Sequence, residues 1–434
     1  MKLRTDPIVI TELEVATFLA ISPTMKLPTP IAGASRSAAA ALLSASLLFS
    51  PLNDNSPLVP APLRAASTAQ ARELASGSGS RVNKDPESLL RLGLPGQPKG
   101  IRDVQVKIEE AADDLTRLLL IPADQALGGA KGALKSQQSS ILKAVPASSA
   151  SQGAALYDSI VAKVNAASAA VSQGQATVAL ESLQSSLGDV SKLEESIASA
   201  YQQPVPTEAT KGNLPWLKGR ATVAFELKRP GGKFDVDGTL YDKINLAMVI
   251  DGYTAPITGG NFVELVNSGF YNNFKIQRSD GFVVQTGDPK AEGKQEKNGF
   301  VPPGGSDVRK IPLEVFVRGD KAPMYGVTFD DDGRGGYASA LPFNAYGALG
   351  MAREEYDADS ASSQWFWLLF DSDLTPAGKN LLDGRYACFG YTTEGARLLS
   401  DVKEGDLIVS AKVTAGLDNL QNVQKPALAA LAPQ

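Results

Sequence analysis

The sequence predicts a multidomain protein with an all-α N-terminal helical bundle followed by a closed antiparallel β-barrel capped by helices. Three observations support this prediction. Between residues 101 and 201 apolar residues recur every three or four positions, which is the period of an amphipathic helix. Beyond residue 218 they alternate with polar residues, as in half-buried strands. At 434 residues, 43% hydrophobic and 21% charged, the chain is long enough for two ordinary domains.

The composition excludes several kinds of chemistry. The chain has no histidine, which excludes Ser-His-Asp and Cys-His catalysis and the commonest zinc ligands. Cys388 is the only cysteine, so neither an intramolecular disulfide nor a cysteine-based metal site can form. The acidic clusters Asp330–Asp332 and Glu354–Glu355 lack EF-hand spacing and are interpreted as solvated loop charges. A formal net charge of −5 gives no reason to expect nucleic-acid binding, and no cofactor is predicted.

The first part of the chain has the composition of a targeting segment. Residues 38–49 form an apolar stretch that is too short to cross a bilayer but suits a signal-type core. The preceding segment carries Lys26 and Arg36 without acidic residues, and Ala69-Gln70-Ala71 offers a cleavage site. A start at Met25, a disordered tail or a short buried helix are the alternatives. No transmembrane span is predicted.

The predicted organisation has six parts, defined by changes of composition and period. They are a transit and lumen-targeting segment (1–71), a linker with a short helix (72–100), a four-helix bundle (101–201), a second linker (202–218), the β-domain (219–420) and a tail (421–434).

Four apolar stripes predict the helices of the bundle, with breaks near Pro122, residues 146–151 and residues 172–174. Each helix needs its neighbours to bury its stripe, which favours an up-and-down arrangement. The bundle has no cofactor-ligand pattern and would act through its surface.

The β-domain is predicted from short alternating strands and two helices. Residues 221–227 and 244–250 alternate with period two. In one helix Thr258 is the expected N-cap and Gly269 the terminator, and the second helix is expected near residues 393–402.

The segment SDGFVVQTGD (residues 279–288) contains an unusual strand. Phe282, Val283 and Val284 are good strand formers, but Gln285 brings an amide that needs hydrogen-bond partners if it is buried. Gln285 either faces solvent at a strand end or belongs to a binding site.

Five ordered blocks place this segment in context: TAPITGGNFVELVNSGFY, GFVVQTGDP, GMA, SSQWFWLL and LLDGRYACFG. Together they strongly resemble the cyclophilins, and with the helical N-terminal region they are most similar to the large thylakoid-lumen cyclophilins of chloroplasts. The resemblance covers roughly residues 85–425. It implies peptidyl-prolyl cis-trans isomerase activity in the chloroplast thylakoid lumen.

The resemblance also implies a proline-binding groove on the outer face of the barrel. In the family one arginine donates to the prolyl amide during rotation, and Arg278 is the candidate for this catalytic role. The implied substrate-binding residues are Phe282, Val283, Gln285, Ala352, Gln364, Phe366, Leu382 and Tyr386.

Several positions depart from the family pattern. Counting back from Phe282, the family's arginine position holds Gln277, with Arg278 one step further on. Successive strand residues face opposite sides, so this step matters. Tyr386 replaces a histidine, Leu381 a tryptophan and Arg353 an asparagine, and the extra loop 321–342 could cover the groove.

Two functions therefore remain open from the sequence. The first is an isomerase with a weakened groove that acts on proline-containing protein segments, such as lumenal parts of photosystem II subunits, and aids assembly or maintenance. The second is a non-catalytic chaperone or docking protein that binds its partner through the bundle or the altered groove.

Overall fold

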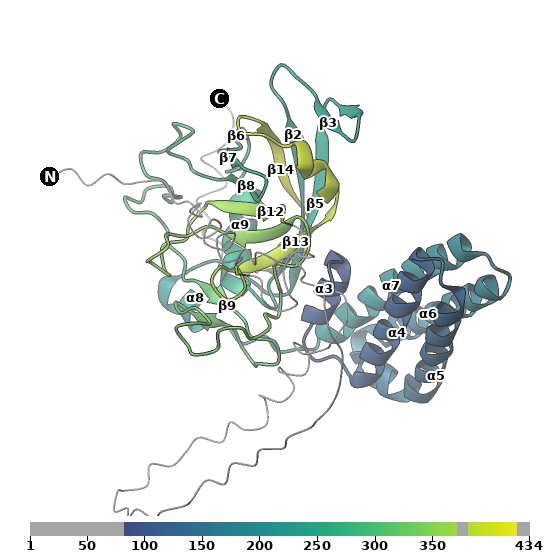
Figure 1. Ribbon diagram of the computed structural model, residues 1–434. Coiled ribbons are helices and arrows are strands. Elements are labelled where there is room, and N and C mark those ends of the chain that lie inside the picture. Colours follow the sequence, from purple (N-terminus) through teal and green to yellow (C-terminus); the bar gives the residue numbers. More distant parts are fainter. Residues whose placement is uncertain (1–81, 371–380, 423–434) are drawn as a thin grey trace, which may run out of the picture. The chain divides into compact units, whose positions relative to one another are not determined.

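The computed structural model describes residues 82–370 and 381–422 (Figure 1). The predicted targeting segment (1–71) and all but two residues of the predicted tail lie outside the described part. Within the described residues, no helix combines the length and the apolar composition that a membrane span requires.

The N-terminal described region is helical. A short helix, α3, is capped by Asp85, whose carboxylate accepts the N–H of Ser88 at 2.9 Å. Four longer helices follow, and their predicted apolar stripes meet in one buried cluster that runs from Ile101 to Ile197. The helices of this region are α3 (Pro86–Gly93), α4 (Lys99–Thr116), α5 (Leu120–Ala144), α6 (Ala150–Ser172) and α7 (Ala176–Ala198).

The first interhelical break lies earlier than predicted. The chain turns at residues 117–119, where Leu118 has a φ of 59°, and α5 already begins at Leu120. Pro122 therefore lies inside the first turn of α5, where its missing N–H has no intrahelical partner to lose. The break predicted near Pro122 is thus found at residues 117–119, just before this proline.

The C-terminal region is built on one nine-stranded antiparallel sheet in the order β6-β14-β2-β5-β13-β11-β12-β8-β7. The long strands at its centre keep the predicted alternation, with every second residue of β2 buried. The strands of the sheet are β2 (Arg220–Lys228), β5 (Ile244–Asp251), β6 (Phe274–Lys275), β7 (Arg278–Ser279), β8 (Val283–Thr286), β11 (Ala348–Met351), β12 (Trp365–Leu368), β13 (Cys388–Glu394) and β14 (Leu407–Ala415).

The sheet is curled but open, so the prediction of a closed barrel was wrong. Its two edge strands, β6 and β7, follow one another in the chain, and no ladder joins them within the described residues. The two residues between them bond outward instead: the N–H of Ile276 donates to Asp406 O and that of Gln277 to Gln285 O. Residues 274–279 thus form both edge strands of the sheet as one continuous extended segment, and this segment cannot form a ladder with itself.

Small two-stranded ladders complete the region. They are β1 (Trp216–Leu217) with β15 (Leu420–Gln421), β3 (Phe234–Val236) with β4 (Thr239–Tyr241), and β9 (Glu314–Val315) with β10 (Met324–Tyr325). The segment predicted as a second linker holds β1 and a short helix, α8 (Thr207–Gly212).

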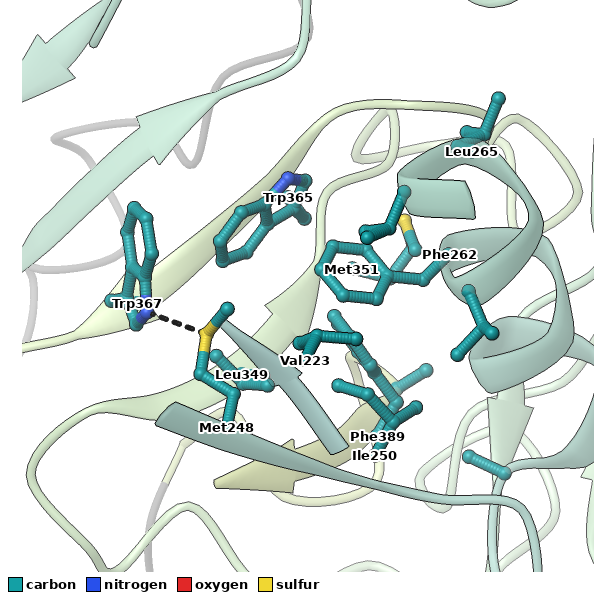
Figure 2. Close-up of a cluster of buried hydrophobic side chains, with 14 of the residues drawn as sticks. Val223, Met248, Ile250, Phe262, Leu265, Leu349, Met351, Trp365, Trp367 and Phe389 are labelled. Atoms are coloured by element: carbon teal, nitrogen blue, oxygen red, sulfur yellow. Dashed lines mark hydrogen bonds between the residues drawn. The ribbon is translucent and has the colours of Figure 1, made fainter. Parts of the chain in front are cut away.

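The core lies between the concave side of the sheet and helix α9 (Pro256–Asn267). Figure 2 shows Phe262 of α9 beside Trp365, with the two ring centroids 5.0 Å apart. Trp365 and Trp367 pack edge to face at 4.2 Å, and the Trp367 indole N–H donates to the Met248 sulfur at 3.2 Å. Both tryptophans are fully buried.

One local helix prediction was wrong. Helix α9 begins at Pro256, so Thr258 lies in its first turn and is not the N-cap. The helix predicted near residues 393–402 is present as a shorter 3-10 helix, Ala396–Asp401, which follows the end of β13. Gly269 does follow the end of α9 with a φ of 73°, which agrees with the prediction.

Candidate active-site groove

Two of the predicted groove residues, Gln285 and Phe366, lie on the outer face of the neighbouring strands β8 and β12. Trp365 and Trp367 of β12 point into the core, so Phe366 between them points to the opposite face. Phe366 lies opposite Gln285 of β8 on one side and opposite Gly350 of β11 on the other. Because directly opposed residues of antiparallel strands share a face, these side chains form one row across the sheet.

Two buried amides lie at one end of this row. Gln285 Nε2 donates to Gln364 Oε1 at 3.2 Å, and Gln364 Nε2 donates to Asn298 O at 2.9 Å. The backbone of Gln364 in turn accepts the N–H of Ala352 at 3.0 Å. Gln285 is therefore buried within a polar network and does not face solvent at a strand end.

Aromatic rings surround Phe366. The Phe343 ring stacks on it, with centroids 6.0 Å apart and planes 15° apart. The Tyr386 ring approaches edge-on at 6.0 Å. Phe282 lies apart from these rings and stacks on Phe370 at 5.9 Å. Phe282 and Leu382 are half-buried, whereas Phe366 has no exposed surface.

The edge of the sheet brings both Gln277 and Arg278 opposite Gln285. Arg278 is the register partner of Gln285, and the N–H of Gln277 also donates to Gln285 O at 2.9 Å. The backbones of Gln277 and Arg278 thus both lie against Gln285, in the manner of a β-bulge.

Each of the two side chains at the bulge is engaged locally. Arg278 Nε donates to Asp280 Oδ2 at 2.6 Å, and the two side chains form an ion pair. The Gln277 amide donates to Asp288 O at 3.0 Å and accepts the N–H of Asp288 at 3.2 Å.

Arg353 has a structural role beside the groove. Its guanidinium donates to the carbonyls of Arg385 (2.9 Å), Glu354 (2.8 Å) and Glu355 (2.9 Å), and it lies over the Tyr386 ring at 5.0 Å. These contacts fix the turn that follows Ala352, and they explain why an arginine can be buried there.

The extra loop 321–342 contacts the turn that carries Leu382 and Tyr386. Phe329 packs on Gly384, and its N–H donates to Gly384 O at 2.9 Å. Asp330 forms an ion pair with Arg385 at 3.0 Å. Just after the loop, the N–H of Phe343 donates to Asp383 Oδ1 at 2.8 Å. Burial raises the pKa of Asp383 to about 7.

The structure thus brings most of the predicted residues together and adds others. Val283, Gln285 and Phe366 share the outer face through direct register pairs, and Gln364 and Ala352 border it. Phe343, Gly350 and Asp280 were missed, because nothing in their spacing marks them as neighbours of the groove. Among the described residues no group of acidic or cysteine side chains is arranged to hold a metal ion.

A curled antiparallel sheet with an outer-face row of glutamine and phenylalanine defines a peptide-binding domain of the cyclophilin type. Residues 236–424 match the model for the cyclophilin type peptidyl-prolyl cis-trans isomerase/CLD family. Residues 85–198 match a second model, that of the PsbQ-like domain of CYP38-like peptidyl-prolyl cis-trans isomerases.

Three curated relatives extend over most of the chain. Peptidyl-prolyl cis-trans isomerase CYP38, chloroplastic, from Arabidopsis thaliana is 40% identical over 342 residues, or 78% of this chain and 76% of the relative. A putative thylakoid lumen peptidyl-prolyl cis-trans isomerase from Synechocystis sp. is 37% identical over 78% of this chain and 84% of its own. The Arabidopsis protein CYP37, chloroplastic, is 29% identical over 84% of this chain and 77% of its own.

The chain belongs to the cyclophilin-type peptidyl-prolyl cis-trans isomerase family, among its CYP38-like members. The predicted family and the predicted location in the chloroplast thylakoid lumen are thereby confirmed.

Proposed function

We propose that this protein is a thylakoid-lumen isomerase with weak catalytic activity, which binds proline-containing segments of photosystem II subunits and aids their assembly or maintenance. The family and the location are those of its relatives. The photosystem II partner and the weak catalytic activity are additional parts of the proposal, which the relatives do not provide.

The groove would act by holding a proline and its flanking backbone while the peptide bond rotates. Rotation of an X-Pro bond is opposed by about 18–20 kcal/mol, and the bond isomerises over tens of seconds or longer without a catalyst. In the proposal, Phe282, Phe366 and Leu382 supply the apolar surface for the proline ring. Gln285 would hydrogen-bond the substrate backbone through its amide.

The observation that carries the proposal of weak activity is the Arg278–Asp280 ion pair. A catalyst has to stabilise the twisted amide nitrogen, and a positively charged donor does this best when it is preorganised toward that atom. The Arg278 guanidinium is committed to a carboxylate two residues away, and the Gln277 amide is committed to the Asp288 backbone. Neither donor is preorganised for the substrate.

A protease-coupled proline-peptide assay tests this proposal. We expect slow turnover by the wild-type protein and faster turnover by Gln277→Arg, because the variant carries a cationic donor at the family's position. Gln184→Arg, an exposed position on α7, is the matched control and should change nothing. Wild-type turnover equal to that of an ordinary cyclophilin would contradict the proposal.

A second candidate function is docking without catalysis, through an up-and-down four-helix bundle of the PsbQ-like kind. It is favoured by the turn between α4 and α5, where Leu118 and Ile121 are 74% and 75% exposed. Leu118 also adopts a left-handed backbone conformation that is costly for a leucine. Contiguous exposed apolar patches mark interaction sites, and these two side chains are the candidate contacts for a partner.

Binding to photosystem II membranes separates the two candidates. The double variant Leu118→Ser, Ile121→Ser should lose binding under the docking hypothesis while its isomerase activity stays at the wild-type level. Unchanged binding by this variant would remove the docking function from this turn.

A further inference from the structure

The turn between α4 and α5 ends α4 with a Schellman motif, in which glycine is the usual residue. The N–H of Leu119 donates to Asp114 O at 2.8 Å, and the N–H of Leu118 donates to Leu115 O at 2.9 Å. This pair of hydrogen bonds goes with a left-handed backbone at residue 118, and Leu118 has a φ of 59°. The conformation is costly for a leucine, because its Cβ crowds the following carbonyl oxygen.

The turn between α6 and α7 has the same motif and does carry glycine. The N–H groups of Gln175 and Gly174 donate to Ala170 O and Val171 O, each at 2.9 Å. Gly174 has a φ of 72°, and a Cβ added to it would meet nothing within 4 Å. Space therefore does not decide which residue stands in the motif. We expect glycine at residue 118 to make the α4–α5 turn more stable than leucine does.

Packing within the described residues does not account for Leu118 either. Leu118, Leu119 and Ile121 are 74%, 41% and 75% exposed, whereas Leu120 between them packs against the helical core. The three exposed side chains form an apolar tip, which the turn presents to the outside at a cost in stability. A contact with another molecule would account for leucine at residue 118.

The apolar tip is too small for a specific protein interface. Such an interface buries about 800 Å² on each partner and takes roughly 20–30 residues from each side. The α6–α7 turn lies at the same end of the helical region, because neighbouring helices run antiparallel (Figure 1). This second turn is polar and exposed at Ser172, Gln173 and Gln175, so the patch does not continue onto it. A lipid bilayer, in contrast, requires no minimum area and accepts a convex tip.

The charges around the apolar tip favour lipids without net charge. Residues 113–124 carry three carboxylates, Asp113, Asp114 and Asp124, and one cation, Arg117. The Arg117 guanidinium is paired with both Asp113 and Asp114, at 3.1 Å from the latter. The acidic excess would be repelled by anionic headgroups, because like charges near a membrane surface are unfavourable.

We propose that Leu118, Leu119 and Ile121 form a lipid-contact site, through which the helical region binds reversibly to a membrane of uncharged lipids. A few aliphatic side chains give weak and reversible attachment, as a single acyl chain does. This site differs from the docking candidate above in its partner, which is lipid and not a photosystem II protein. It does not depend on the proline groove.

Vesicle flotation tests the lipid-contact site. The chain from residue 72 onward is used, because it keeps every described residue and omits the apolar stretch at residues 38–49. We expect it to bind phosphatidylcholine vesicles more tightly than phosphatidylglycerol vesicles. Leu118→Gly should bind phosphatidylcholine about tenfold more weakly, because most of one exposed leucine is removed from the contact. Its melting temperature should rise by about 4 °C, so weaker binding cannot be attributed to unfolding.

Gly174→Leu is the matched control, because it places a left-handed leucine in the other Schellman motif. It should lower the melting temperature and should not weaken vesicle binding. Equal vesicle binding by wild type and Leu118→Gly would overturn the proposal, as would preference for phosphatidylglycerol. Leu118-dependent binding to photosystem II membranes without any binding to vesicles would assign the apolar tip to a protein partner and also overturn it.

Tryptophan fluorescence reports contact with the bilayer directly. The native tryptophans Trp216, Trp365 and Trp367 are at most 5% exposed, so vesicles should leave their emission unchanged. The variant Ile121→Trp adds an indole at the apolar tip, and its emission should shift to shorter wavelength when phosphatidylcholine vesicles are added. An unshifted spectrum under conditions of vesicle binding would place the contact elsewhere and overturn the proposal.

The isomerase assay separates this inference from the proposed function. Leu118→Gly should turn over a proline peptide at the wild-type rate, because the substitution lies in the helical region. Loss of vesicle binding with unchanged turnover would support the lipid-contact site. A vesicle result against the site would leave the isomerase function untouched, and absence of isomerisation would leave the site untouched.

Discussion

Asp280 connects the backbone of the groove to the candidate catalytic residue, Arg278. Its Oδ1 accepts the N–H groups of Phe282 and Val283, each at 3.0 Å, while its Oδ2 binds Arg278. Partial burial acts to raise the pKa of this carboxyl. The two backbone hydrogen bonds and the Arg278 charge outweigh burial and hold the pKa below its usual value. The carboxylate therefore stays charged and keeps the guanidinium at the edge of the groove.

The variant Asp280→Asn separates the two roles of Asp280, which are to accept the backbone N–H groups and to hold Arg278. The asparagine retains the Oδ1 acceptor for the backbone but loses the charge that holds Arg278. We expect kcat/KM for a proline peptide to rise about tenfold, equivalent to about 1.4 kcal/mol of transition-state stabilisation, because the guanidinium becomes available to the prolyl amide. The protease-coupled assay measures this change.

The control for Asp280→Asn is the double variant with Arg278→Ala, which should return to the wild-type rate. A rise that persists without Arg278 would show that the gain has another source.

The sequence predicts the residues of the groove better than it predicts their orientation. Phe282, Val283 and Gln285 could be assigned because they stand in one contiguous motif, and strand alternation then sets their faces. Which of Gln277 and Arg278 opposes Gln285 could not be predicted, because the bulge depends on how β7 registers against β8. Gly350 was missed for a similar reason, because its contact is with the Phe366 ring, which belongs to another strand.

The N-terminus of helix α9 is capped by a residue that is distant in the sequence. The carboxylate of Glu314, on β9, accepts the N–H groups of Ile257 and Thr258 at 3.2 and 2.8 Å. The local sequence suggested Thr258 as the N-cap. A capping residue on a distant strand cannot be recognised from the residues next to the helix. Glu314 also ties the hairpin β9–β10, whose second strand lies within the extra loop, to the core of the domain.

The burial of Glu314 predicts an unusual dependence of stability on pH. Burial raises the pKa of Glu314 to about 7, and the hydrogen bonds from Thr258 and Ile257 only partly oppose this. The folded state then binds a proton more tightly than the unfolded state. Glu314 therefore adds stability as the pH falls from about 7 toward the ordinary glutamate value, and this stability is lost as the pH rises through 7.

Chemical denaturation of wild type and Glu314→Gln between pH 8 and pH 5 measures this contribution. Glutamine keeps a carbonyl acceptor for the helix but cannot titrate. The free energy of unfolding of the wild type should rise on the order of 2 kcal/mol more than that of the variant over this range. Glu226→Gln, at a half-buried carboxylate paired with Lys243, is the control. Parallel curves for wild type and Glu314→Gln would contradict the assignment.

The helical and β-rich parts of the chain each have their own apolar core. One cluster extends from Ile101 to Ile197 and the other from Ala209 to Leu420, and they share no residue. The change from a helical period to strand alternation could be read from the sequence because each part buries its own apolar pattern. The open sheet could not be predicted from the sequence, because closure of the sheet depends on which strands pair with residues 274–279.

Separate cores predict separate folding. Fragments 82–200 and 203–422 should each unfold cooperatively, with midpoints within about 5 °C of the corresponding transitions in the full chain. Differential scanning calorimetry of the two fragments and the full chain measures this. A fragment that shows no cooperative transition would contradict the independence of its core.

The position of β14 in the sheet has a consequence for the synthesis of the protein. β14 lies between β6 and β2, and Thr414 hydrogen-bonds Thr222, a residue 192 positions earlier in the chain. Contacts over such distances form slowly, because a long loop must close before any of them is gained. During translation β2 can pair with β5 early, but its second partner, β14, emerges much later. The β-rich part of a newly made chain therefore cannot complete its sheet until β14 has been made, and until then this part stays in a state in which a polypeptide can still be threaded through a membrane pore.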